Sequence, residues 1–191
     1  SHEYTKKFLK IGIQKQNQLK KQIKVLKKIR VSEGNRFVEI LPSDTLSINL
    51  SIDYPNTIIG KSQFYYNHSQ ENFIKYISQA RTYALFEDIE KMRTSGNAMG
   101  GNLNNAIVVD KFKILNTEGL RFDKEFVKHK TLDCIGDLYL LGMQLNGHIN
   151  CFAPGHKLNQ KLVLEILKDH ENYRIMDMSQ VDPTCNYFNI L

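Results

Sequence analysis

The sequence predicts an α+β protein in which a mostly antiparallel sheet and a layer of helices form a two-layer α/β sandwich. Three stretches alternate apolar and polar residues as half-buried antiparallel strands do, namely 22–31, 36–41 and 45–54. A later stretch, 123–142, has the apolar spacing of a helix that packs on a core. Strands and helices in this mixed order favour α+β architecture over a parallel, doubly wound sheet.

The remaining elements are predicted from local signals. A short helix over 3–11 should end at Gly12, because glycine is favoured at the position that follows a helix. Ser69 is expected to cap a helix over 70–79 and Asp123 to cap the helix that follows it, since both side chains accept hydrogen bonds from first-turn amides. The other predicted elements are strands at 62–66, 112–115, 144–152 and 173–178 and a helix at 158–168.

Residues 81–110 are predicted to form a unit of strand, helix and strand, with its strands at 82–85 and 106–109 and its helix at 87–94. The unit has no GxGxxG phosphate loop and no Walker motif. From its residues alone it is an ordinary crossover connection.

Composition and length indicate one globular domain. The 191 residues are 41% hydrophobic and 24% charged, and no apolar run reaches the roughly 18 residues that a membrane span needs. Three cysteines without metal-finger spacing (Cys134, Cys151 and Cys185) fit a reducing cytoplasm, where they are small apolar residues.

Positive charge is concentrated near the N-terminus. Residues 1–30 contain ten Lys or Arg and one Glu, whereas the whole chain has a net charge of +6. Such a stretch can bind nucleic acid or an anionic membrane. No aromatic residues are interleaved as a base-stacking platform, so we expect no nucleic-acid partner and at most peripheral membrane contact.

The helix at 123–142 carries the clearest chemical signal. His129, Asp133 and Asp137 follow one another at spacings of four, and each step turns the helix by only about 40°. The three side chains therefore project from one side, while Val127, Ile135 and their neighbours face the core. An imidazole and a carboxylate so arranged can bind one zinc ion. Helical residues at this spacing are more often solvated neighbours or simple ion pairs.

Three blocks carry a resemblance to a known family. They are GLRFDKEFVKHKTLDCIGDLYLLG at 119–142, the segment from Ala80-Arg81-Thr82-Tyr83 to Val109-Asp110, and Gly155-His156-Lys157-Leu158-Asn159. Together they resemble the UDP-3-O-acyl-N-acetylglucosamine deacetylases, zinc enzymes of lipid A biosynthesis, over about residues 12 to 168. The resemblance implies a cytoplasmic hydrolase of a Gram-negative-type bacterium that releases acetate from a UDP-sugar with an acyl chain.

The resemblance also implies roles for single residues. His129 and Asp133 would be zinc ligands, and Asp137 would hold His156 in place as a charged acid. Thr82 would donate to the oxyanion, and Lys130 would contact the polar head of the substrate. Without the resemblance, each of these residues can equally be an ordinary surface residue, strand residue or ion-pair partner.

The strand-helix-strand unit at 81–110 corresponds in that family to an insertion that walls a passage for the acyl chain. The matching positions are Tyr83, Ile89, Ala98, Gly101, Leu103 and Val108. A buried core would have the same apolar composition.

Two departures from the family pattern matter. The family's third zinc ligand and general base form a Glu-His pair in an earlier domain, and this chain contains no Glu-His dipeptide. The family's lysine before the Ser-Gly-His step is also absent from the run Phe152-Ala153-Pro154-Gly155-His156. We therefore expect 1–18 to be a remnant helix and linker from a missing N-terminal domain, and 19–191 to be the C-terminal deacetylase domain.

Such a chain, with a third zinc ligand missing, is expected to be inactive alone. Two alternatives stay open at this point. One is a non-catalytic acyl- or nucleotide-sugar-binding module derived from the family, and the other is an unrelated α+β domain with coincidental motifs.

Overall fold

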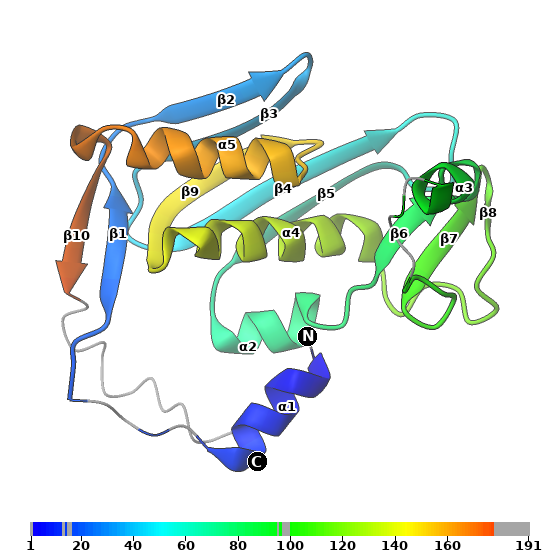
Figure 1. Cartoon of the computed structure of the whole chain (residues 1–191), viewed down its shortest axis with the longest axis horizontal. Helices are drawn as coiled ribbons and strands as arrows, with labels where there is room; N and C mark the ends of the chain where they lie inside the picture. The colour runs from blue at the N-terminus through cyan, green and yellow to red at the C-terminus, as the bar shows by residue number, and fades with distance from the viewer. Residues whose placement is uncertain (1, 13, 15–16, 95, 97–99, 178–191) are drawn as a thin grey trace.

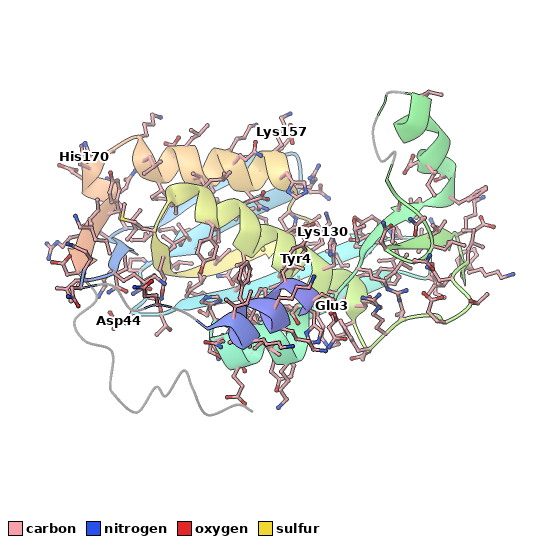
Figure 2. The ribbon with its side chains drawn as sticks, turned by 60° about the horizontal axis from the view of Figure 1, so that its bottom comes forward. Glu3, Tyr4, Asp44, Lys130, Lys157 and His170 are labelled. Carbon is pink, nitrogen blue, oxygen red and sulfur yellow. The ribbon has the colours of Figure 1, made fainter. Side chains whose placement is uncertain are left out.

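A computed structural model describes residues 2–12, 14, 17–94, 96 and 100–177. It has two layers, in which α4 (Glu125–Leu138) and α5 (His156–Leu167) lie side by side across one face of a sheet (Figure 1). The predicted α+β sandwich is confirmed. Lys157 and His170, labelled in Figure 2, lie near the two ends of α5.

Strand β9 is the centre of the main sheet. The strands are β1 (Lys21–Val25), β2 (Ile29–Glu33), β3 (Arg36–Leu41), β4 (Leu46–Tyr54), β5 (Gly60–Asn67), β9 (Gln144–Phe152) and β10 (Tyr173–Asp177). Strand β9 pairs with β1 through its first residues and with β3 and β4 through the rest of its length. Strands β5, β2 and β10 lie outside β4, β3 and β1. Within the described main sheet, the pairings of β9 with β1 and β4 are parallel and the other four are antiparallel, so antiparallel pairs predominate, as predicted.

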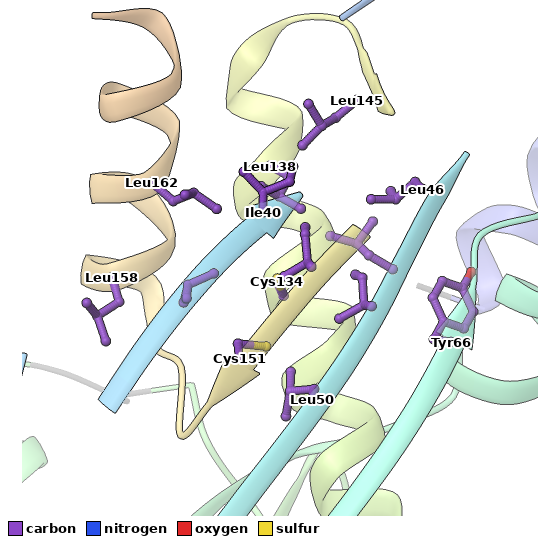
Figure 3. Packing of buried hydrophobic residues seen from close by; sticks show 14 of the residues in the cluster. Ile40, Leu46, Leu50, Tyr66, Cys134, Leu138, Leu145, Cys151, Leu158 and Leu162 are labelled. Atoms are coloured by element: carbon purple, nitrogen blue, oxygen red, sulfur yellow. The ribbon is translucent and has the colours of Figure 1, made fainter. Parts of the chain in front are cut away.

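The core lies between the sheet and the two helices. Alternate residues of β3, β4 and β9 face inward and meet apolar residues of α4 and α5, as the labelled Ile40, Leu50, Leu138 and Leu162 show (Figure 3). This burial is the main source of stability. It also fixes α4, because one side of the helix is held in the core while His129 and both aspartates remain on the other.

The predicted single strand over 22–31 is wrong. The chain breaks after Val25, where the amide of Leu26 donates to Asn172 O at 2.9 Å, and it resumes pairing at Ile29 with a different partner. Buried residues keep the same odd-numbered alternation across the break, with Val25 and Ile29 both in the core. A change of hydrogen-bonding partner leaves the apolar periodicity intact, so the pattern did not reveal it.

Two helix boundaries also differ. Lys124 precedes α4 in the left-handed region (φ 59°), and Asp123 does not cap it. Instead, Glu125 accepts a hydrogen bond from the amide of Arg121 at 2.7 Å. Helix α5 begins at His156, two residues before the predicted start.

The Ser69 cap is confirmed, because its hydroxyl accepts from the amide of Asn72 at 3.0 Å. The helix that it begins, α2 (Gln70–Asn72), continues as a π-helical turn, η1 (Phe73–Ile77). Two 3₁₀ turns, η2 (Tyr139–Leu141) and η3 (His170–Asn172), follow α4 and α5. The last predicted strand is present as β10, and its final residue, Met178, lies outside the described residues.

The predicted strand-helix-strand unit is present. Strands β6 (Thr82–Leu85) and β7 (Ala106–Asp110) pair in parallel, α3 (Phe86–Thr94) follows β6, and the short β8 (Lys113–Ile114) pairs with β7. These strands form a second sheet at the end of the molecule where α4 begins (Figure 1).

Helix α1 (His2–Ile11) ends at Gly12 as predicted, with Gly12 at φ 90°. None of its residues is buried. It lies next to α2 (Figure 1), where His2 Nδ1 is 3.2 Å from Ser78 Oγ.

Candidate metal site and histidine–aspartate pair

His129 and Asp133 lie together on one side of α4. Nε2 of His129 is 3.2 Å from Oδ1 of Asp133, and their side chains are only 13% and 17% exposed. The other ring nitrogen, Nδ1, is 3.3 Å from the carbonyl oxygen of Ala80. Both nitrogens of the imidazole therefore face oxygen atoms.

This arrangement constrains the protons of His129. A carbonyl oxygen can only accept, so the contact with Ala80 requires the proton on Nδ1. Burial lowers the pKa of His129 and so favours the neutral ring, although the Asp133 carboxylate and the Ala80 carbonyl act in the opposite direction. In the neutral ring with Nδ1 protonated, Nε2 turns a lone pair toward the Asp133 carboxylate. Two lone pairs facing each other at this distance favour a cation between them.

The separation of the two atoms suits zinc. Two ligands at about 2.0–2.1 Å from one tetrahedral zinc ion lie roughly 3.3–3.4 Å apart, close to the 3.2 Å between His129 Nε2 and Asp133 Oδ1. The described ranges contain no group of three or more His, Cys, Asp or Glu that could hold a metal. Within them, the donor set is limited to these two residues.

Lys130 adds positive charge beside the pair. Its Nζ lies 3.4 Å from Oδ2 of Asp133 and 5.8 Å from the centre of the Tyr83 ring. It is labelled in Figure 2 on α4. The ammonium partly neutralises Asp133, and its position next to the pair leaves it able to contact an anionic group.

Asp137 connects α4 to the start of α5. Nδ1 of His156 lies 2.9 Å from Oδ2 of Asp137, and the Nδ2 amide of Asn159 donates to the same oxygen at 2.8 Å. The side chain of His156 is 64% exposed, so Nε2 is available to solvent or a ligand. An aspartate that accepts from Nδ1 fixes the orientation of the ring.

Asn159 is a residue of this cluster that the sequence analysis missed. It is 1% exposed, and its Oδ1 is buried with no hydrogen-bond partner among the described residues. A signal was available, because Asn159 follows His156 by three residues and a helix that begins at His156 brings both to one side.

Thr82 is not brought into hydrogen-bonding contact with either histidine. It is exposed at the first position of β6, and its hydroxyl has no hydrogen bond within the part of the chain that the structure describes. Successive residues of a strand point to opposite faces. Tyr83, the next residue, packs on His129 with ring centres 6.2 Å apart.

Tyr83 contacts the site most closely among the positions matched to the acyl passage. Its ring packs edge-on against Phe126 at 5.0 Å, its hydroxyl donates to that of Tyr54 at 3.2 Å, and burial raises its pKa. The other matched positions range from buried Val108 and half-buried Ile89 to exposed Gly101 and Leu103, and Ala98 lies outside the described residues. The structure therefore does not gather them into one buried wall.

A buried ion pair between Arg81 and Glu125 was also missed. The guanidinium and carboxylate are 2% and 0% exposed and meet at 2.9 Å. Arg81 also donates to Glu118 at 2.6 Å and to the carbonyl of Gly119 at 2.7 Å. A buried charge pair of opposite sign on 81 and 125 has no periodic signal in a single sequence, so only the fold reveals it.

Comparison of the sequence with known proteins finds a matching family model and similar proteins. Residues 1–168 match the family model for LpxC, UDP-3-O-acyl N-acetylglycosamine deacetylase. Relatives named UDP-3-O-acyl-N-acetylglucosamine deacetylase include that of a Nitratiruptor species, 42% identical over 88% of this chain and 56% of the relative. The protein of Campylobacter fetus is 42% identical over 84% and 55%, and that of Actinobacillus succinogenes is 44% identical over 86% and 54%.

The chain is an α+β homologue of proteins that are named as deacetylases, which are hydrolases. The chain belongs to the UDP-3-O-acyl N-acetylglycosamine deacetylase family. It spans just over half the length of the curated relatives it matches. No helix within the described ranges is long and apolar enough to cross a membrane.

Proposed function

We propose that this chain supplies the metal-binding and acyl-binding half of a zinc-dependent deacetylase that acts on UDP-3-O-acyl-N-acetylglucosamine in lipid A biosynthesis, in the cytoplasm. The observation that carries the proposal is the 3.2 Å approach of His129 Nε2 to Asp133 Oδ1 on one side of α4. A neutral imidazole and a carboxylate at this separation can supply two of the ligands of a zinc site. The family membership supplies the reaction class.

When bound, zinc would act as a Lewis acid on the acetyl carbonyl and lower the pKa of a bound water to about 7. In this chain His129 and Asp133 would hold the ion, and Lys130 would contact the anionic head of the substrate. The neutral state of His129 matches this role, because a metal ligand must offer a lone pair.

His156 would move the proton that leaves with the amine. Asp137 accepts from Nδ1, so the exposed Nε2 of His156 is the atom that can donate to the departing nitrogen. Thr82 would contribute its hydroxyl to the developing oxyanion. That role requires the substrate to reach the exposed start of β6, because the hydroxyl does not contact His129 or His156.

Tyr83 would border the acyl chain of the substrate. Its ring lies against His129 and Phe126, and its neighbours in the 81–110 unit are the family's acyl-passage positions. Substrate apolar surface packed there would stabilise binding through the hydrophobic effect.

The 191 residues alone are proposed to be inactive. The family's Glu-His pair is absent from this sequence, so a third ligand and the general base must come from another segment. Loss of general-base catalysis alone costs roughly 10²–10⁴-fold in rate. Helix α1, which buries none of its residues, is proposed to belong with that other segment.

Metal titration and acetate release test the proposal. Co²⁺ bound by the chain should give a d–d absorption band that His129→Ala and Asp133→Ala weaken. His148→Ala is the matched control, because His148 lies in β9 and hydrogen-bonds Ser47 Oγ at 2.7 Å, away from the site. Acetate should be released only when a Glu-His-bearing N-terminal half of a relative is added in trans.

Two outcomes would contradict the proposal. One is a Co²⁺ band that survives both substitutions. The other is turnover by the isolated chain near that of a complete relative. Acyl-substrate binding without acetate release, even after addition of the N-terminal half, would favour a non-catalytic acyl- or nucleotide-sugar-binding module.

A further inference from the structure

We propose that the buried Arg81–Glu125 ion pair is a positioning device for His129, acting through the single peptide group that joins Ala80 to Arg81. The pair holds this peptide so that its carbonyl keeps the proton of His129 on Nδ1. This leaves the lone pair of Nε2 on the Asp133 side, and the inference rests on the proposed function only in naming that lone pair as a metal ligand.

Both carboxylate oxygens of Glu125 accept hydrogen bonds. The donors belong to Arg81, just before β6, and to Arg121, in the segment before α4. Its Oε1 accepts from the amide of Arg81 at 3.1 Å and from Nε of Arg81 at 2.9 Å. Its Oε2 accepts from Nη2 of Arg81 at 3.1 Å and from the amide of Arg121 at 2.7 Å. Both the backbone and the side chain of Arg81 are therefore bound to one carboxylate.

The amide of Arg81 and the carbonyl of Ala80 are two sides of one peptide group. No peptide bond in the described chain is cis, so this group is a rigid plane whose N–H and C=O point in opposite directions. Its N–H donates to Glu125 Oε1 at 3.1 Å, and its oxygen lies 3.3 Å from Nδ1 of His129.

Glu125 and His129 are four residues apart on α4, so they stand one above the other on the same side of the helix. The helix therefore holds the peptide plane at both of its polar ends. Rotation of the plane would break the contact with Glu125 and the contact with His129 together. Because Nδ1 can meet the carbonyl only as a donor, the held plane selects the Nδ1-protonated tautomer.

A purely structural role is the alternative, since the same ion pair also ties Arg81 to Glu118 and Gly119. The two roles differ in what they predict for His129 in a chain that remains folded. Replacing both charges of a buried pair by apolar side chains of similar size is often neutral for stability, whereas removing one charge is not. The double variant Arg81→Met/Glu125→Met therefore removes the acceptor for the peptide N–H without leaving a buried charge.

The test is ¹⁵N NMR of the imidazoles in the metal-free 191-residue chain, with the His129 signals assigned from a His129→Gln variant. We expect the wild-type ring to be predominantly protonated on Nδ1. The double variant should shift toward the Nε2-protonated tautomer at unchanged midpoint of urea unfolding. Arg81→Lys keeps the amide and should keep the wild-type tautomer.

The control is Arg30→Met/Glu39→Met, which removes a second Arg–carboxylate pair that meets at 2.8 Å on the sheet. It should leave the His129 signals in place. Loss of an outer hydrogen-bond partner typically weakens metal affinity roughly 10–100-fold, so Co²⁺ binding should weaken by that factor in Arg81→Met/Glu125→Met and not in the control.

Two results would overturn the positioning role: a wild-type His129 protonated on Nε2, or a folded double variant with the wild-type tautomer. If the double variant does not fold, Arg81→Gln/Glu125→Met is measured by the same criterion, because it removes the same acceptor and keeps a polar side chain near Glu118 and the carbonyl of Gly119. A tautomer shift without any Co²⁺ binding by the wild type would support the positioning role and contradict the proposed metal site.

Discussion

The Nδ2 amide of Asn159 donates to Oδ2 of Asp137 at 2.8 Å, and the same oxygen lies 2.9 Å from Nδ1 of His156. One carboxylate on α4 thus receives two donors from the first turn of α5. Asn159 is buried, so its amide is fixed by packing, whereas His156 is exposed and free to meet a ligand. The buried Asn159 therefore orients Asp137 from the side of the core, while the exposed His156 contacts it from the side of the solvent.

Asn159→Asp should destabilise the protein, and more so as pH rises. The new carboxyl would lie at hydrogen-bond distance from Asp137, and two like charges this close raise the pKa of one of them in the folded state. Stability relative to wild type is then highest while that group is protonated and falls as pH rises through its folded-state pKa. Urea unfolding at pH 5 and pH 8 measures the difference.

Asn159→Ala is the control, because it removes the donor without adding charge. Its cost should be about 1–3 kcal/mol and nearly independent of pH between these values. If Asn159→Asp lowers the free energy of unfolding equally at pH 5 and pH 8, residue 159 does not lie against the Asp137 carboxylate as described.

Glu125→Gln should cost about 3–5 kcal/mol at pH 7, because it leaves Arg81 charged and buried without its partner. Burial by itself would raise the pKa of Glu125, but the hydrogen bonds from Arg81 and from the Arg121 amide outweigh it and hold the pKa below its usual value of 4.5. The stabilisation is therefore fully present above pH 4.5 and is lost as pH falls through the folded-state pKa.

Unfolding midpoints of wild type and Glu125→Gln should thus converge below pH 4.5. The comparison variant is Glu165→Gln, whose partner Lys168 is solvent-exposed, and its effect should stay below about 1 kcal/mol. If the difference in unfolding midpoint between wild type and Glu125→Gln stays constant from pH 7 to pH 3, loss of the ionised pair does not explain the destabilisation.

Gly147→Ala should destabilise the sheet by about 1–3 kcal/mol. An added Cβ would lie 2.6 Å from Cδ1 of Ile40 and 3.3 Å from the carbonyl oxygen of Leu41, and Ile40 is fully buried. In the double variant with Ile40→Ala the clash is removed, so the two losses should not add.

Gly136→Ala gives the opposite sign. Nothing lies within 4 Å of a Cβ at this exposed position of α4, so the alanine should stabilise the helix by roughly 0.5–1 kcal/mol. Chemical denaturation of all four variants checks the pair of expectations, and a neutral Gly147→Ala would mean that Ile40 repacks freely.

Deleting residues 2–11 should change the free energy of unfolding by less than about 1 kcal/mol. Helix α1 buries none of its residues, so its removal takes little apolar surface out of the core. Thermal and urea unfolding of the shortened chain measure the change. A loss of several kcal/mol would mean that α1 is part of this domain rather than of another segment.

Most elements could be predicted from the sequence because each has its own periodic or capping signal. The alternation of β9 indicated its bounds over 144–152, Gly12 indicated the end of α1, and Ser69 indicated a cap. The spacing of His129, Asp133 and Asp137 placed them on one side of α4. These are local properties that are visible in a single sequence.

What could not be predicted depends on contacts between distant residues. The break between Val25 and Ile29 follows from a change of strand partner, and the role of Glu125 follows from Arg81, 44 residues earlier. The first turn of α4 looked like an Asp123 cap because aspartate is the usual residue there. No side chain caps the helix there, and Glu125 instead binds Arg81, whose charge makes burial of the carboxylate possible.

The central place of β9 has a consequence for how the chain folds. Its parallel pairing with β4 joins residues about 100 positions apart, such as Leu46 and Gly147, and within the described main sheet no earlier strand bridges them. Closing so long a loop costs conformational entropy before the paired strands contribute any stabilising contacts, and this slows folding. The last strand of this sheet in chain order, β10, pairs with β1, so the sheet is complete only after nearly the whole described length has been synthesised.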